Sequence, residues 1–257
     1  IEEMEKPNNR VRTWCEPEEY PEVVELLADR DIIGQLDEEE VPVVEGELVV
    51  NGIFGVEKPK DPPVKLKSGL MGPVLRLIMN LTNSNACQIS IDGDISRLPT
   101  ALQWNMVSLL AYEIIIWTSS DRRCFFYIFR IPRPWWKWQA FERKVEEVWL
   151  GKGGGAGLKR ICSRVVGMGW LSAVGITQHL NRNMLNRQWR IPPQLRGGGK
   201  PGSSSDAASG SLKELKPRLE LRRDRPLPYG FQAQETTAWA VYIDNFDEGE
   251  IIEREAG

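Results

Sequence analysis

Two aspartates interrupt apolar, strand-forming segments of the chain. Asp121 separates "IIIWTSS" from "RRCFFYIF", and Asp244 lies within "WAVYIDNF". A carboxylate at the end of a buried strand is costly to desolvate unless it binds something. If the two strands are neighbours, the carboxylates repel each other, and a divalent cation relieves that repulsion. Oxygen ligands favour Mg²⁺ or Mn²⁺, and a pair of such ions can activate a hydroxyl and stabilise a leaving pyrophosphate.

Asp244 also has a simpler interpretation. The residues that follow it are strongly acidic, as at an exposed hairpin tip. The segment "AVYIDNFDEGE" does not by itself distinguish such a tip from half of a metal site. Asp247 is a further carboxylate in this segment, but we expect it to face another way.

Charge is distributed very unevenly along the chain. Residues 1–50 contain sixteen Asp or Glu against four Lys or Arg, a net charge of −12. Residues 51–228 contain 28 Lys or Arg against 13 Asp or Glu, a net charge of +15, and the last 29 residues have a net charge of −6. A basic body with a compact acidic cluster suits an enzyme that acts on polyanions. A solvated basic surface with an acidic tail is the alternative.

The sequence gives little support for a zinc site, a disulfide framework or a membrane span. The four cysteines form no CxxC pair and His179 is the one histidine, so neither a zinc site nor a disulfide framework is predicted. We interpret His179 as a polar residue on a helix surface. The longest apolar run, 106–117, is too short to span a bilayer and contains Glu113, which predicts a buried helix or strand pair. Without a visible targeting signal, the expected location is intracellular, in the cytoplasm or nucleus.

The alternation of strand and helix signals predicts an α+β or α/β fold rather than an all-α bundle, and α+β is the expected class. The acidic residues 1–40, with one short helical pattern over 21–33, are expected to pack loosely or to serve as a linker. The remaining expected elements are a β-hairpin over 41–60 with Asn51-Gly52 as its turn, strands over 73–82 and 123–132, helices over 100–117 and 169–189, and a low-complexity linker over 196–211.

Four blocks within residues 48–250 resemble, in their order, the polymerase region of a retroelement reverse transcriptase. The first block, "RLIMNLTNSN", resembles a strand of the fingers that begins with an arginine. By this resemblance Arg76 contacts the triphosphate of the incoming nucleotide, and Lys58 is a second contact.

The second block, "SDRRCFFYIFRIP", is similar to the first catalytic block of that family. The resemblance implies that Asp121 binds both metal ions and that Arg122 offers its backbone carbonyl to metal. It also implies that Phe126 lies under the sugar and excludes a 2′-hydroxyl. Plain core packing is the alternative for Phe126.

The third block, "VVGMGWLSAVGITQHL", is similar to the family's template- and nucleotide-gripping block. Gly169 matches a glycine where the backbone approaches the base pair closely, and Met168 stands at the position of a glutamine. The fourth block, 242–245, resembles the YxDD hairpin. Asp244 falls on the main metal ligand, and Asn245 replaces the second Asp, offering a carbonyl oxygen without charge.

Taken together, the resemblance implies a right-hand polymerase with fingers and a palm, an antiparallel palm sheet backed by helices, and no thumb. It implies an RNA-directed DNA polymerase that uses Mg²⁺ or Mn²⁺, dNTP and an RNA/DNA template–primer, with no membrane partner and with other domains of the parent polyprotein missing. The alternative is a catalytically decayed remnant that at most binds nucleic acid. The expected divisions are an acidic extension over 1–40, fingers over 41–118, palm over 119–195 and 229–257, and a basic insertion over 196–228.

Three tryptophans follow the second block. Trp135, Trp136 and Trp138 are candidates for stacking on bases. Packing of the palm against a neighbouring helix is the alternative for them.

Overall fold

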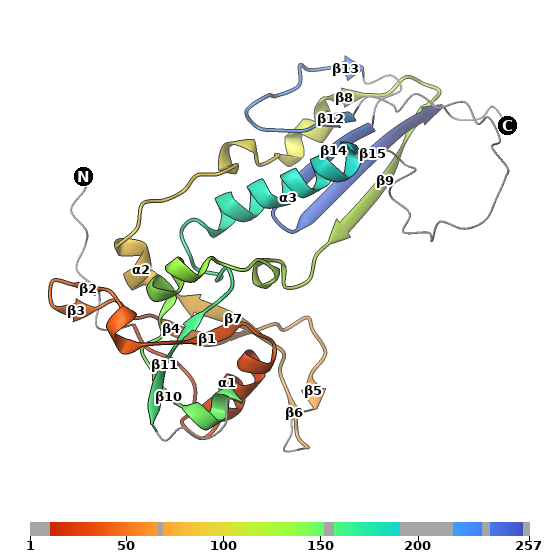
Figure 1. Ribbon diagram of the computed structural model, residues 1–257. Helices are drawn as coiled ribbons and strands as arrows, with labels where there is room; N and C mark the ends of the chain where they lie inside the picture. Colours follow the sequence, from red (N-terminus) through yellow and green to blue (C-terminus); the bar gives the residue numbers. More distant parts are fainter. Residues whose placement is uncertain (1–10, 66–68, 152–156, 191–217, 233–236, 254–257) are drawn as a thin grey trace, which may run out of the picture. The chain divides into compact units, whose positions relative to one another are not determined.

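The computed structural model describes residues 11–65, 69–151, 157–190, 218–232 and 237–253. The chain forms two compact units, which are described separately. The first unit comprises Ile1–Ile91 and Cys124–Ala173, and the second comprises Asp92–Arg123 and Val174–Gly257. Helices and mostly antiparallel strands occur together (Figure 1), which confirms the α+β class. The predicted linker over 196–211 lies outside the described residues.

The first unit is built around a three-stranded antiparallel sheet with the order β1-β11-β10 and three two-stranded antiparallel sheets, β2–β3, β4–β7 and β5–β6. Its elements are α1 (Tyr20–Asp29), β1 (Ile33–Leu36), β2 (Val43–Val44), β3 (Glu47–Leu48), β4 (Gly52–Glu57), β5 (Val64–Lys65), β6 (Met71–Gly72), β7 (Leu75–Asn80), α2 (Thr82–Ala86), β10 (Val145–Glu146) and β11 (Leu158–Ser163), with short 3₁₀ helices at Glu38–Glu40, Phe125–Ile128, Arg133–Gln139 and Glu147–Leu150.

The second unit contains a four-stranded sheet with the order β12-β14-β15-β9, and α3 packs against it. Its elements are β8 (Val107–Ser108), β9 (Glu113–Asp121), α3 (Ala173–Arg190), β12 (Arg218–Glu220), β13 (Phe231–Gln232), β14 (Thr237–Tyr242) and β15 (Asn245–Glu253), with 3₁₀ helices at Ile95–Arg97 and Ala101–Met106. Only the first residue of α3 belongs to the other unit. β13 pairs separately with β8.

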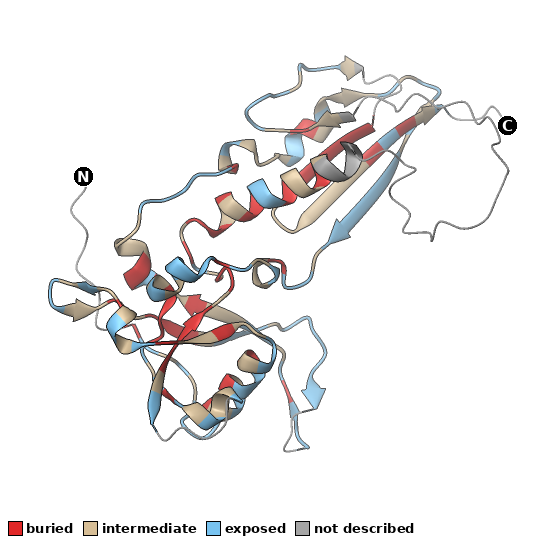
Figure 2. Cartoon of the chain, in the orientation of Figure 1, coloured by how far each residue is buried: buried red, intermediate tan, exposed pale blue. Residues whose placement is uncertain are grey.

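The sheet of the second unit has two distinct faces. Trp239 and Val241 of β14 pack with Leu185 of α3 on one face, whereas Ala238 and Ala240 belong to a separate cluster. β14 is buried along most of its length, and β9 at the edge of the sheet is largely exposed (Figure 2). The predicted burial of the apolar run 106–117 is therefore wrong: its residues are half-buried or exposed, and its second half forms the edge strand.

The acidic N-terminal region is better ordered than its composition predicts. Proline opens α1, and the helix buries Tyr20 and Val24, which are 1% and 0% exposed. β1 then pairs with β11 over its full length, from Ile33 to Leu36. The expectation of a loose segment is wrong for this part, because its few apolar residues fall at the spacing that one helix face requires.

The predicted Asn51-Gly52 turn is also wrong. The hairpin turns at Glu45-Gly46, where φ is 51° and 83°. Asn51 is fully buried, and its amide donates to the carbonyls of Trp138 and Ala140 at 3.1 and 2.9 Å. A Cβ on Gly52 would lie 2.1 Å from a backbone oxygen. The Asn-Gly pair therefore serves tertiary hydrogen bonding and close packing.

Two further element predictions are wrong. Residues 100–117 form a 3₁₀ helix followed by strands, and residues 123–132 contain a 3₁₀ helix where a strand was expected. Cys124 has a φ of 54°, which ends any extended run, and Phe125 then packs on Phe129 with ring centroids 4.9 Å apart. In contrast, the strand predicted over 73–82 and the helix predicted over 169–189 are confirmed as β7 and α3.

Candidate active site

The fourth block forms a tight hairpin. Tyr242 at the end of β14 pairs with Asn245 at the start of β15, so that Ile243 and Asp244 form a two-residue turn. Ile243 has a φ of 56°, an unfavourable conformation for a β-branched side chain. Such strain persists only where surrounding contacts hold it, and it commonly marks a functional turn.

Two buried amides from α3 hold this turn. Gln178 donates to the carbonyl of Val241 at 2.7 Å and accepts from the N–H of Ile243 at 2.8 Å. Asn181 donates to the carbonyl of Ile243 at 2.7 Å. Both side chains are fully buried. The sequence interpretation missed these residues, although their spacing of three within one helix is the signal that places them on a common face.

β9 brings Asp121 to the same corner of the sheet. Its last residue, Asp121, lies directly opposite Asn245, and the N–H of Arg122 donates to the carbonyl of Asp244 at 3.1 Å. Residues directly opposite each other in an antiparallel pair share a face of the sheet, with Cβ atoms about 5 Å apart. The predicted neighbourhood of these strand ends is therefore present in the fold.

Asn245 links the two aspartates. Its amide donates to the Asp244 carboxylate at 3.2 Å. Asp247 lies two residues further along β15, opposite Ser119. Because side chains alternate between faces, it is on the same face as Asn245. The expectation that Asp247 faces another way is therefore wrong.

The carboxylate oxygens at this corner are ligands of the type that a hard divalent cation prefers. Asp121 is exposed and Asp244 is half-buried, so both carboxylates are accessible to an ion. Mg²⁺ is commonly held by one or two protein carboxylates together with substrate phosphates. Among the described residues, no group of three or more His, Cys, Asp and Glu side chains could hold a metal ion. A metal at this corner would thus depend on the substrate for further ligands.

A buried ionic network fixes α3 beside the sheet. Arg182, which is 6% exposed, contacts both Asp94 and Glu220, and Asp94 also pairs with Arg97. Burial by itself would raise the pKa of the Asp94 carboxyl, but the hydrogen bond and charge of Arg182 hold that pKa below its usual value. His179 lies 3.2 Å from Asp94 and extends this network at its exposed edge.

The predicted triphosphate contacts lie on one hairpin of the first unit. Arg76 of β7 is exposed and lies opposite Val56 of β4. Lys58 follows β4, and its backbone N–H donates to the carbonyl of Val74 at 2.9 Å. Its ammonium group is 3.3 Å from Asp61. The Lys58 side chain is 39% exposed and therefore accessible, and a surface ion pair of this kind contributes little stability.

The other predicted nucleotide-binding residues also belong to the first unit. The ring of Phe126 is half-buried and 6.1 Å from that of Phe125. The Met168 carbonyl accepts from the N–H of Met79 at 3.1 Å. Gly169 has a φ of 111°, and a Cβ there would lie 2.2 Å from the Met79 carbonyl oxygen. Close packing against β7 thus accounts for this glycine without a bound base pair.

The predicted site residues therefore fall into two groups. The second unit brings together Asp121, Arg122, Asp244 and Asn245. The first unit contains Lys58, Arg76, Phe126, Met168 and Gly169.

Comparison with known proteins adds no relative. No family model and no curated protein matches the chain. Among the described residues, no helix combines the length and apolar composition needed for a membrane span. The functional interpretation therefore depends on the residues and on the geometry of the second unit.

Proposed function

We propose that this chain is the RNA-directed DNA polymerase region of a retroelement, which adds dNTP to a primer 3′ end. The observation that carries the proposal is the strand register that sets Asp121 opposite Asn245 and beside Asp244. Three residues that the resemblance assigns to catalysis come from two distant blocks of sequence. Their meeting at one corner of a sheet is what two-metal nucleotidyl transfer requires of its ligands.

In this proposal Asp121 and Asp244 hold Mg²⁺ or Mn²⁺, with the Arg122 carbonyl as a further oxygen donor. The bound ions would activate the primer 3′-hydroxyl and stabilise the leaving pyrophosphate. The side chain of Asn245 supplies only a neutral oxygen. The α3 amides keep Asp244 in place by holding the strained turn that carries it.

Arg76 and Lys58 supply positive charge for the triphosphate, and Phe126 acts as the sugar gate. Met168 and Gly169 shape the nascent base pair. The net charge of +15 over residues 51–228 suits a template–primer, since binding to nucleic acid is dominated by phosphate contacts. The polymerase fold, with fingers and palm, is part of this proposal.

One observation favours a catalytically decayed remnant. Asn245 lacks the charge of the second aspartate, and its amide donates to Asp244 at 3.2 Å, which uses one of the lone pairs of that carboxylate. In such a remnant the basic surface binds nucleic acid without synthesis.

Primer extension on an RNA template, with Mg²⁺ or Mn²⁺ in separate reactions, tests the proposal. We expect Asp121→Ala and Asp244→Ala to abolish extension, and Asn245→Asp to increase it and to lower the metal concentration required. The matched control is Asp92→Ala, which removes an exposed aspartate of the same unit. Extension that persists in Asp121→Ala contradicts the enzyme proposal, and binding of the template without any extension, even in Asn245→Asp, supports the remnant.

A further inference from the structure

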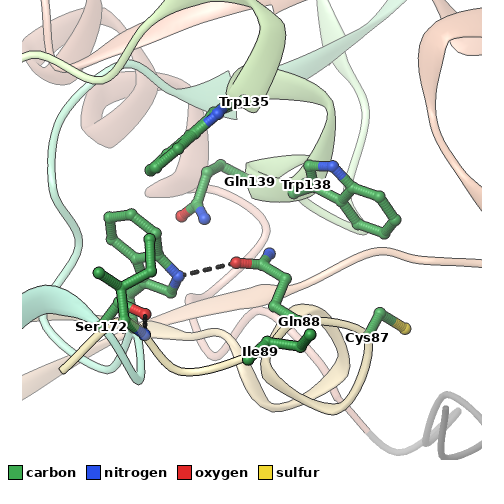
Figure 3. A pocket seen from close by; sticks show the side chains of 9 residues that line it. Cys87, Gln88, Ile89, Trp135, Trp138, Gln139 and Ser172 are labelled. Atoms are coloured by element: carbon green, nitrogen blue, oxygen red, sulfur yellow. Dashed lines mark hydrogen bonds between the residues drawn. The ribbon is translucent and has the colours of Figure 1, made fainter. Parts of the chain in front are cut away.

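A pocket of about 380 Å³ lies within the first unit, and all of its lining residues belong to that unit. This volume is in the range that small-molecule sites use. The pocket is lined mainly by indole rings, two glutamine amides and an isoleucine (Figure 3), namely Gln88, Ile89, Trp135, Trp138, Gln139 and Trp170. Ile89 is 91% exposed, which places an apolar side chain at the rim.

The indoles form the aromatic wall. Trp135 meets Trp170 edge to face, with centroids 5.3 Å apart and an interplanar angle of 82°. Trp136, the third member of the predicted stacking group, packs instead against the core and donates to the carbonyl of Ile131 at 3.1 Å. The three tryptophans therefore differ. Trp136 packs internally, as one alternative expects, whereas Trp135 and Trp138 face a pocket.

Two amide atoms at this pocket have no hydrogen-bond partner within the described part of the chain. Gln139 is 2% exposed, and its Oε1 is unpartnered. Gln88 Oε1 accepts from the indole N–H of Trp170 at 2.9 Å, which leaves the buried Gln88 Nε2 unpartnered. An indole can only donate, so this bond fixes the orientation of the Gln88 amide. Figure 3 shows both amides pointing into the same space.

The unpartnered atoms define what a ligand must offer. Gln139 Oε1 needs a donor, and Gln88 Nε2 needs an acceptor. The indoles require a flat, apolar face. A nucleobase has all three properties, because each base carries donors and acceptors on one edge and a π-face for stacking. The base must be unpaired and unstacked, since a duplex hides its faces and its Watson–Crick edge.

A proline-rich peptide is the other common occupant of a tryptophan-lined groove. Proline has no N–H, so it leaves Gln139 Oε1 without a donor. Lys137 also favours a nucleic acid. Its ammonium group lies 5.8 Å from the centroid of the Trp138 ring, beside the pocket, where it can contact the phosphate next to a bound base.

We infer that this pocket binds one unpaired nucleobase of a single-stranded nucleic acid, stacked on Trp138 and read by Gln88 and Gln139. The inference rests on the proposed function, because a polymerase template would be the single-stranded nucleic acid that this pocket binds. Its test measures binding and not synthesis, so that loss of one does not imply loss of the other.

Fluorescence anisotropy with the full chain and labelled twelve-nucleotide RNA tests the inference. The matched ligand is a twelve-unit abasic phosphodiester, which keeps the phosphates and removes the bases. We expect the abasic strand to bind at least about tenfold more weakly, because stacking a single base accounts for an effect of this order. Equal affinities for the two strands would overturn the inference.

Variants then locate the site. Trp138→Leu and Gln88→Met should each weaken RNA binding about five- to tenfold and leave abasic binding unchanged. The control is Trp14→Leu, which removes a tryptophan of the same unit that is 75% exposed. Asp92→Ala, which removes an exposed aspartate of the second unit, should bind RNA normally. Folded pocket variants with wild-type affinity contradict the inference.

A crosslinking experiment on the unmodified protein guards against variants that fail to fold. RNA with 5-iodouridine at a single position is irradiated with the full chain, and the crosslinked peptide is identified by mass spectrometry. A crosslink at Trp135 or Trp138 supports the inference. Crosslinks confined to other residues, or displacement of the RNA by a proline-rich peptide, overturn it.

Discussion

Two buried glutamines, one in each unit, show how the same side chain can serve opposite purposes. Gln178 is 0% exposed and uses both ends of its amide, one on Val241 and the other on Ile243. Gln139 is 2% exposed, and its Oε1 has no partner in the described part of the chain. A buried amide with all of its bonds made positions its neighbours, whereas one with an unmet bond costs free energy until a ligand supplies it.

The same contrast extends to the surroundings of each glutamine. Around Gln178, a buried network through Arg182 holds α3 to the strand that follows it. Around Gln139, indoles and an exposed isoleucine leave a pocket. The hairpin corner is therefore held by amide hydrogen bonds and a buried ionic network, although Asn181 Oδ1 also lacks a partner among the described residues. The pocket combines unpartnered amide atoms with indole rings. Four pairs of variants test this difference, and the pair with the largest expected effect comes first.

Arg182→Met should have the largest effect on stability. Removing this guanidinium leaves the buried Asp94 carboxylate with a weaker partner and takes from Glu220 its ion-pair partner among the described residues, which costs about 3–5 kcal/mol of unfolding free energy. Urea denaturation followed by tryptophan fluorescence measures it. The control is Arg97→Met, which removes a partly exposed partner of the same aspartate and should cost less than about 1 kcal/mol. Equal losses would contradict a central role for Arg182.

The two glutamines themselves provide the next comparison. Gln178→Leu leaves the carbonyl of Val241 and the N–H of Ile243 without partners and should cost about 2–4 kcal/mol. Gln139→Leu removes an atom that already lacks a partner, and it should cost less than about 1 kcal/mol. Urea denaturation of both variants measures the difference. A larger loss of unfolding free energy for Gln139→Leu would show that the Gln139 amide stabilises the fold and is not kept for ligand binding.

Local features of the candidate site could be predicted from the sequence, but its long-range contacts could not. The hairpin around Asp244 follows from an apolar run that ends in polar turn residues, and α3 follows from helical spacing. The pairing of β15 with β9, which sets Asp121 opposite Asn245, depends on contacts between distant segments. For the same reason Gln178 and Asn181 read as ordinary polar residues, since their partners lie on another element.

The aromatic segment shows a different limit of sequence interpretation. The residues from Phe125 to Ile128 have strong strand propensity, yet they form a 3₁₀ helix, because burial of Phe125 outweighs local preference. The pocket was foreseen only as a group of tryptophans. Nothing in the local pattern shows that Trp136 packs internally while Trp135 and Trp138 line a pocket.

Ile243→Gly tests whether the turn is held under strain. Glycine accepts the positive φ of this position, and the relief should raise the free energy of unfolding by about 1 kcal/mol after the entropy cost of glycine. Ile243→Val is the matched control, because valine remains β-branched and should give no gain. The urea midpoint of each variant measures the effect. Destabilisation by glycine would show that the isoleucine side chain contributes more by packing than its backbone costs.

The smallest effect concerns pH, and it compares one carboxylate from each unit. Asp94 and Glu38 both have a pKa below the usual value: the Asp94 carboxyl because Arg182 outweighs the opposing effect of burial, and the Glu38 carboxyl because Arg160 hydrogen-bonds to it. A lowered pKa in the folded state stabilises the fold above the unfolded pKa of about 4. This stabilisation is lost as the pH falls through the lowered value.

Urea midpoints at pH 6, 4 and 3 should therefore decrease in the wild type. Asp94→Asn should remove more of this decrease than Glu38→Gln, because the Asp94 side chain is 4% exposed and that of Glu38 is 37% exposed. Solvent screens the more exposed pair. An equal change in both variants would mean that the two units depend on buried charge to the same extent. Tight ionic positioning would then no longer distinguish the hairpin corner from the unit that contains the pocket.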